Sequence, residues 1–167
     1  YETMKNDPAP MEGSKLFNVL YGSQFKFDKE AMPAEIDALT EKIMKEYEEG
    51  EKPERRKRIL LTGCPSSGAP MKVVKAIEEN GGNVVVYENC GGAKSVDRLI
   101  DEEAEDIYQA IAERYLAIGC SVMTPDTNRY ELLERLLDEY QVEGVVEMTL
   151  QACHTYNVET RAIRKFV

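Results

Sequence analysis

The sequence predicts a three-layer α/β fold in which a parallel sheet of about four strands lies between helices. Short apolar runs such as Arg58–Thr62 and Asn83–Tyr87 alternate with helix-length segments, as in parallel strands joined by right-handed crossovers. Three of the four cysteines, Cys64, Cys90 and Cys153, follow such a run at the turn toward the next helix. Because the carboxyl ends of parallel strands are where ligands bind, we expect these three thiols at one functional edge of the sheet.

The first 57 residues are predicted to form a linker and a helical lead-in. Residues 1–13 are polar and contain prolines, so we expect a linker or an extended arm. Helices are expected over residues 14–27 and 31–49. The apolar side chains of the second helix recur at helical spacing and should pack inward: Ile36, Leu39, Ile43, Met44 and Tyr47. The charged run at 46–58 is typical of a solvated helix end and connector.

Residues 58–167 are predicted to form the α/β domain itself. Gly81 and Gly82 should end its first helix, and Asp126 or Thr127 can cap a later one. The expected elements are a strand at 58–62, a helix at 70–80, a strand at 83–87, a short helix at 95–101, a helix at 105–118, a loop or very short strand at 119–125, a helix at 128–140, a strand at 145–149 and a helix at 155–166. The helix at 105–118 carries an apolar stripe of Ile107, Ile111, Tyr115 and Ile118. A doubly wound sheet usually has one more strand, which we expect beyond Val167.

The composition excludes several classes of partner. The chain has 167 residues, a formal net charge of −10 and a pI near 4.8, which argues against nucleic acid or an anionic membrane surface as the main partner. No apolar run approaches the roughly 20 residues that span a bilayer, and no signal-peptide pattern is visible. With no Cys-x-x-Cys pair, a zinc ribbon is not expected, and we predict reduced thiols in a cytoplasm. A start at Tyr1 and an end within a helix indicate a piece of a longer protein.

The first two cysteine segments each support two interpretations. In GCPSSGAP, at 63–70, backbone amides could hold an anion at a helix N-terminus, or the segment is an ordinary β–α turn. Cys64 there is either a reactive thiol or a small buried hydrophobic residue. In ENCGG, at 88–92, the glycines allow a cluster or substrate to approach the backbone closely, or they make a tight turn. The turn alone does not explain Glu88 and Cys90 together.

The third segment, QACHTYN at 151–157, holds the only histidine of the chain. Cys153 and His154 could form a nucleophile and base, but adjacent loop residues usually point apart and no orienting acid is evident. A metal or cluster thiolate suits Cys153 better, with His154 supporting the ligand or donating a hydrogen bond to substrate. Cys120 is predicted to be a packing residue.

These segments together resemble the 2-hydroxyacyl-CoA dehydratase family, which includes the benzoyl-CoA reductase subunits, and within it the double-cubane cluster proteins. The residues that carry the resemblance are TGCP at 62–65, ENCGG at 88–92, CSVMTP at 120–125 and LQACHTYN at 150–157. The four motifs occur in the same order as in the family, and the likeness covers residues 58–167.

The resemblance implies two flavodoxin-like or Rossmann-like domains per subunit, of which this chain would be the second, and a [4Fe-4S] or double-cubane cluster held by both. Most cluster ligands would come from the first domain, so we expect the cluster to be absent from this fragment. Cys153 matches the single ligand of the second domain and is the predicted metal ligand. Cys64 and Cys90 are assigned with it to the cofactor-binding cleft, and Glu88 and His154 are assigned as catalytic.

The resemblance also implies the chemistry and the partners. A low-potential electron, delivered by an ATP-hydrolysing iron–sulfur activator protein, would reduce an acyl-CoA or another small molecule, in a dehydratase-type lyase or a double-cubane-type reductase. A homodimer or heterodimer and an anaerobic cytoplasm are implied. Two alternatives remain: a non-catalytic module that binds an anion or small molecule, with cysteines that only pack, and a thiol sensor in which Cys64 and Cys90 form a disulfide.

Overall fold

The protein is an open, Rossmann-like α/β domain built on a parallel sheet, as expected. Its structure, a computed structural model, describes residues 1–65 and 68–167. In the described part of the chain the sheet has three strands rather than about four, in the order β2-β1-β3. They are β1 (Lys57–Gly63), β2 (Gly82–Tyr87) and β3 (Gly144–Met148). Every residue of β2 is buried, as is typical of a parallel strand covered on both faces.

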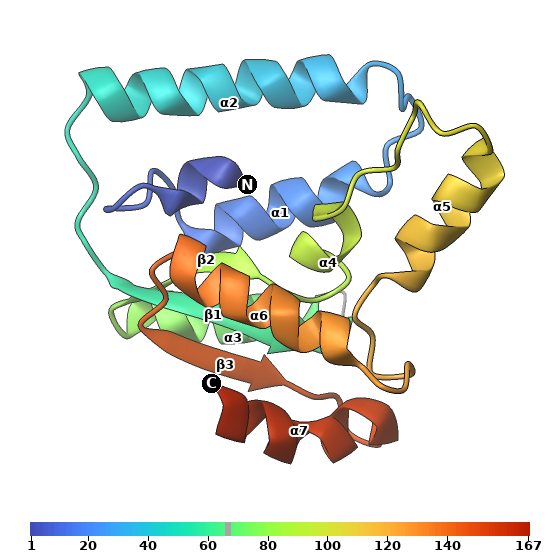
Figure 1. Ribbon diagram of the computed structural model, residues 1–167. Coiled ribbons are helices and arrows are strands. Elements are labelled where there is room, and N and C mark those ends of the chain that lie inside the picture. The colour runs from blue at the N-terminus through green and yellow to red at the C-terminus, as the bar shows by residue number, and fades with distance from the viewer. Residues whose placement is uncertain (66–67) are drawn as a thin grey trace.

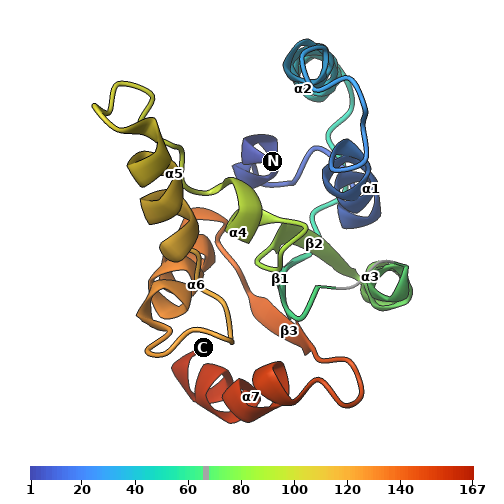
Figure 2. The same ribbon diagram turned by 90° about the vertical axis from the view of Figure 1, so that its right-hand side faces the viewer.

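Helices cover the two faces of the sheet. The described helices are α1 (Gly13–Ser23), α2 (Met32–Glu49), α3 (Ala69–Glu79), α4 (Ala93–Val96), α5 (Ile107–Leu116), α6 (Thr127–Glu139) and α7 (His154–Phe166), after a 3₁₀ turn at Glu2–Lys5. Helices α1 and α3 lie on one side of the sheet, α6 lies on the other, and α7 lies beside β3 (Figure 1, Figure 2). The core between them includes Val74 of α3, Leu133 of α6 and Ile163 of α7.

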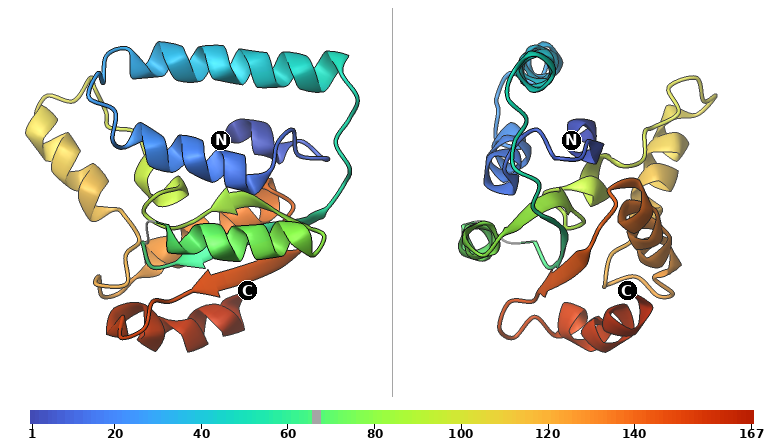
Figure 3. Two further views of the ribbon diagram at one scale, coloured as in Figure 1. Left: turned by 180° about the vertical axis from the view of Figure 1, so that it is seen from behind. Right: turned by 90° about the vertical axis from the view of Figure 1, so that its left-hand side faces the viewer.

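Several elements differ from the sequence predictions. Helix α1 ends at Ser23 rather than near residue 27, whereas residues 119–125 form the predicted loop and not a short strand. Helix α2 stands apart from the sheet (Figure 3) and buries none of its residues, so Ile36 and Leu39, predicted to pack inward, are exposed. The stripe on α5 is exposed at Ile107 and Tyr115 as well. Helical spacing identifies an amphipathic face but does not say whether another element covers it.

The N-terminal segment, expected to be a linker or an extended arm, packs against the sheet instead. Met4 is fully buried in the core. The buried guanidinium of Arg58 donates hydrogen bonds to the carbonyl oxygens of Met4 (2.7 Å), Asn6 (2.8 Å) and Tyr140 (2.8 Å). The polar N-terminal segment therefore belongs to the folded core because its backbone carbonyls satisfy a buried arginine.

In residues 1–65 and 68–167, none of the helices has the length and apolar character that crossing a membrane requires.

Candidate functional site

The carboxyl ends of the three strands meet at one edge of the sheet, which faces the viewer in Figure 2. Cys64 follows β1, the turn with Cys90 follows β2, and the loop with Cys153 follows β3. The described structure therefore has the three thiols on turns at one edge, as the sequence predicts. The turns place the three thiols in different surroundings, so each is described separately.

Cys64 connects the ends of two strands. Its side chain is 2% exposed. The thiol donates to the carbonyl of Met148 (3.3 Å) and accepts from the amide of Leu150 (3.1 Å). Both partners of the thiol belong to the end of β3, so these contacts support a packing role. Ser66 and Ser67 of the predicted anion-binding segment lie outside the described residues.

Glu88 is fully buried at the end of β2 and is paired on both carboxylate oxygens. Oε1 lies 2.9 Å from the Lys94 ammonium and 3.5 Å from Nε of Arg129. Oε2 accepts a hydrogen bond from the hydroxyl of Thr62. A carboxylate that is enclosed in this way cannot contact a substrate directly, but it can fix the positions of Lys94 and Arg129.

Arg129, on the first turn of α6, is a functional candidate that the sequence motifs did not indicate. It is fully buried. Its guanidinium donates to Thr62 Oγ1 (3.0 Å) and to Glu159, and lies 3.8 Å from Glu147. Attraction by Glu88 and Glu159 outweighs the cost of burying this charge and raises the pKa of Arg129. The sequence does contain a signal for the burial of Arg129, because this residue lies at helical spacing from the buried leucines of α6.

Lys94 and Tyr156 connect the buried charges to Cys90. Lys94, 4% exposed, donates to the Tyr156 hydroxyl (3.2 Å). Burial disfavours the ammonium ion, but Glu88 and Tyr156 more than offset this and raise the Lys94 pKa. Burial raises the pKa of the half-buried Cys90 thiol, while Lys94 acts in the opposite direction. Cys120 also contributes to the raised pKa of Cys90, so the fold brings these two cysteines into one neighbourhood.

Asp126 and Glu147 are two further carboxylates near Arg129, and several buried polar atoms in this region lack hydrogen-bond partners. Burial, followed by the charge of Glu159, raises the pKa of Asp126 to about 6, and burial raises that of Glu147. Among the described residues, both Asp126 carboxylate oxygens and Glu147 Oε1 lack a hydrogen-bond partner, as do the hydroxyls of Ser121 and Thr149. Since buried polar atoms are usually paired, this edge retains capacity to bind water or another polar group.

Cys153 occupies a more open position than Cys64. It is the N-cap residue of α7, is half-buried, and its sulfur lies 3.8 Å from the Thr155 hydroxyl. The preceding Ala152 has a φ of +66°, a left-handed turn that is uncommon for a residue other than glycine. His154, the first helical residue, is exposed.

An iron–sulfur cubane requires four ligands, usually thiolates. Within residues 1–65 and 68–167, no three His, Cys, Asp or Glu side chains are grouped to bind a metal ion. Cys153 could supply one thiolate, but the described residues do not form a complete ligand set.

Comparison with known proteins identifies the family. The family model of the 2-hydroxyglutaryl-CoA dehydratase D-component matches residues 1–167. The chain is 50% identical over all of its 167 residues to the putative dehydratase subunit YjiM of Escherichia coli K12, of which it spans 43%. It is 25% identical over 111 residues, 65% of the chain, to a benzoyl-CoA reductase subunit of Thauera aromatica, of which it covers 25%. The chain therefore belongs to the family of the 2-hydroxyglutaryl-CoA dehydratase D-component.

Proposed function

We propose that this chain is one α/β domain of a larger iron–sulfur protein that acts as an (R)-2-hydroxyacyl-CoA dehydratase-like lyase or as a double-cubane-type reductase. The family match supports dehydratase or reductase chemistry. The chain spans less than half the length of the 50%-identical relative, so the ligands and substrate groups missing from this edge would come from the rest of the protein.

The observation that carries this proposal is the position of Cys153. Its thiol is half-buried at the start of a 13-residue helix, after the turn that follows β3. Leu150 and Val158 nearby in the sequence are exposed, by 41% and 79%, and could be covered by the remainder of the protein. Cys153 would thus supply one cluster thiolate; the bound cluster would supply one-electron transfer.

The other site residues would act around that ligand. His154 is exposed beside Cys153 and would donate a hydrogen bond to a substrate. Glu88 would be a positioning residue, because it is fully buried and holds Lys94 and Arg129. Cys90 would line the cleft, and Cys64 would hold the ends of β1 and β3 together.

The full-length protein would need partner proteins. The electron would come from an ATP-hydrolysing iron–sulfur activator protein, and the subunit would work as a homodimer or heterodimer in an anaerobic cytoplasm. The substrate would be an acyl-CoA or another small molecule.

The test is to measure iron and sulfide in the full-length protein after purification without oxygen. Three proteins are compared: the natural sequence, Cys153→Ser and Cys120→Ser. We expect Cys153→Ser to lose most of the iron and sulfide while its circular dichroism spectrum is unchanged. Cys120→Ser is the matched control, because Cys120 is assigned to packing, and should retain its cluster. A Cys153→Ser protein with a full cluster would refute the assignment of this ligand.

A further inference from the structure

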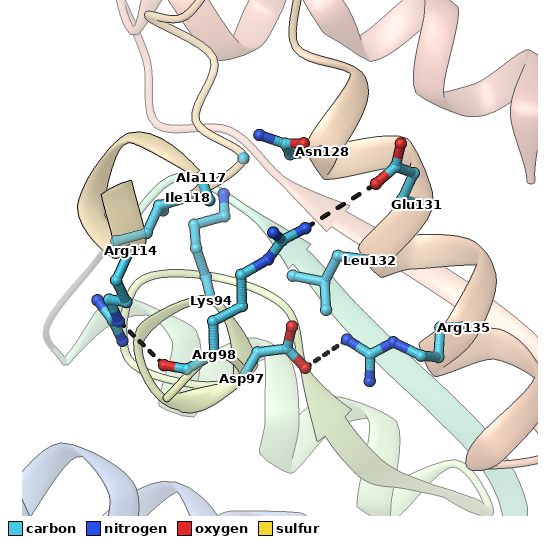
Figure 4. Close-up of a pocket in the computed structure, with 11 residues that line it drawn as sticks. Lys94, Asp97, Arg98, Arg114, Ala117, Ile118, Asn128, Glu131, Leu132 and Arg135 are labelled. Carbon is cyan, nitrogen blue, oxygen red and sulfur yellow. Dashed lines mark hydrogen bonds and ion pairs between the residues drawn. The ribbon is translucent and has the colours of Figure 1, made fainter. Parts of the chain in front are cut away.

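A small basic cavity, lined by none of the cysteines, lies between the turn after α4, the end of α5 and helix α6. Its volume is about 110 Å³. Sites that enclose a drug-sized molecule measure roughly 300–1,000 Å³, so this cavity has space for a single small group. Figure 4 shows the charged side chains around it: Arg98 turns toward Glu131, Arg135 toward Asp97, and Arg114 toward the backbone carbonyl of Arg98.

The charge of this cavity is opposite to that of the whole chain. Four cationic side chains line it, Lys94, Arg98, Arg114 and Arg135, against two carboxylates, Asp97 and Glu131. The chain as a whole has a formal net charge of −10. A local excess of positive charge on an acidic protein attracts anions to this position.

Two of these cations already have strong partners. Lys94 is paired with the buried Glu88 at 2.9 Å. Arg135 is paired with Asp97 and, at 3.4 Å, with Glu139. Because carboxylates already neutralise both side chains, anion binding in this cavity depends on Arg98 and Arg114.

Arg98 and Arg114 retain both positive charge and donors. The guanidinium of Arg98 is 3.9 Å from the Glu131 carboxylate, which is too long for a hydrogen bond. Arg114 donates to the backbone carbonyls of Arg98 (3.0 Å) and Ser95. These carbonyls orient the guanidinium without neutralising it, and each arginine has five N–H donors. Asn128 also lines this cavity.

A second, larger cavity adjoins the basic one. It measures about 480 Å³ and shares Arg98, Arg114 and Ala117 with the first cavity. Its other polar lining consists of four carboxylates, Asp101, Glu105, Asp106 and Glu113, and the amide of Gln109. These carboxylates repel a second negative charge, but they accept hydrogen bonds from hydroxyl groups. The two cavities together favour a molecule with one anionic end and a hydroxyl-bearing body.

We propose that Arg98 and Arg114 form a binding site for the phosphate of a small phosphate monoester whose hydroxylated part lies in the acidic cavity. Planar guanidinium groups bind phosphate oxygens in a bidentate manner, which matches a tetrahedral dianion. The inference does not depend on the proposed iron–sulfur function, because the cavity contains none of the cysteines.

The test is calorimetric titration of the full-length protein with glycerol 3-phosphate, inorganic phosphate and glycerol at constant ionic strength. We expect glycerol 3-phosphate to bind more tightly than inorganic phosphate, and glycerol not to bind. Arg98→Gln should weaken binding of glycerol 3-phosphate by about tenfold or more, because it removes charge-assisted hydrogen bonds. This variant should keep the fold, since the nearest Glu131 carboxylate does not hydrogen-bond to Arg98.

Arg161→Gln is the matched control, because Arg161 is an exposed arginine on α7 and should leave binding unchanged. Arg114→Gln should weaken binding as Arg98→Gln does. Equal affinity of Arg98→Gln and Arg161→Gln for glycerol 3-phosphate would overturn the site. Equal affinity of the natural protein for phosphate and for its glycerol ester would overturn the role of the acidic cavity.

Discussion

Arg129 is the residue on which the buried charges at the carboxyl edge converge. Its guanidinium reaches Glu88 directly after β2, Glu147 on β3 and Glu159 on α7, so a single side chain connects three parts of the fold. A buried ion pair contributes little net stability compared with an apolar replacement of the whole cluster, but removal of one member leaves the others buried and uncompensated.

We therefore predict that Arg129→Met destabilises the protein by about 3–5 kcal/mol. The loss arises because Glu88 and Glu159 lose the guanidinium with which they are paired. Urea denaturation, followed by circular dichroism, measures the change. Arg161→Met, on the exposed surface of α7, should stay within about 0.5 kcal/mol of the natural protein; similar losses for both variants would contradict a special role for Arg129.

Asp126 should make stability depend on pH. Its folded-state pKa is raised to about 6 by burial and by Glu159, from an ordinary value of 3.8. Between these two values the folded state binds more protons than the unfolded state, so this group's contribution to stability falls as pH rises through the window and is constant above it.

Melting temperatures of the natural protein and of Asp126→Asn, measured from pH 4 to pH 8, test this prediction. Asparagine cannot ionise, so the melting temperature of the variant relative to the natural protein should rise from about pH 4 to pH 6 and then level off. A difference that is independent of pH would show that Asp126 does not titrate in this window.

At the scale of elements, the close approach of β1 and β3 requires a glycine at the end of β1. Gly63 has a φ of +116°, and a Cβ atom there would lie 2.1 Å from the Met148 carbonyl oxygen. No side chain fits this position without movement of the strand end, where Cys64 also binds Met148.

Gly63→Ala should destabilise the protein by about 2–3 kcal/mol, because it adds backbone strain to the steric clash. Gly68→Ala serves as the control, since a Cβ at Gly68 meets no atom of the described residues within 4 Å, and it should be neutral or stabilise by about 0.4–1 kcal/mol. Thermal unfolding of the two variants distinguishes them, and equal melting temperatures would be inconsistent with the packing of β1 on β3.

Helices α2 and α7 show that similar patterns lead to different packing. Both have apolar residues at helical spacing, yet α7 buries Tyr156 and Ile163 whereas α2 buries none of its residues. The pattern of α2 predicted the helix correctly and its environment wrongly, because an amphipathic sequence forms a helix whether or not its apolar face is covered.

At the scale of the whole molecule, the N-terminal segment is part of the same core as the sheet. Met4 and Ala9 pack with residues of β1 and β2, and the Arg58 guanidinium donates hydrogen bonds to two carbonyl oxygens of this segment. The assignment of residues 1–57 to a lead-in and 58–167 to a domain remains a prediction, but the two parts share buried contacts.

Met4→Ala should cost about 2–5 kcal/mol, since it leaves a cavity in the core. Met123→Ala is the comparison, because Met123 is 37% exposed, and it should cost less than about 1 kcal/mol. Chemical denaturation of each variant, compared with the natural protein, measures the two changes in the free energy of unfolding. If the two substitutions have equal effects, the N-terminal segment does not contribute to the core as described.

The sequence by itself determined the α/β class, the order of the elements, the position of Cys64, Cys90 and Cys153 at strand ends, and the family. These properties depend on local periodicity and on short contiguous motifs, which can be read along the chain. Tertiary structure alone decided that Arg129 and Lys94 pair with Glu88, that Met4 is buried and that α2 buries none of its residues. Such contacts join residues far apart in the sequence, and their pairing depends on how the strands and helices assemble in space.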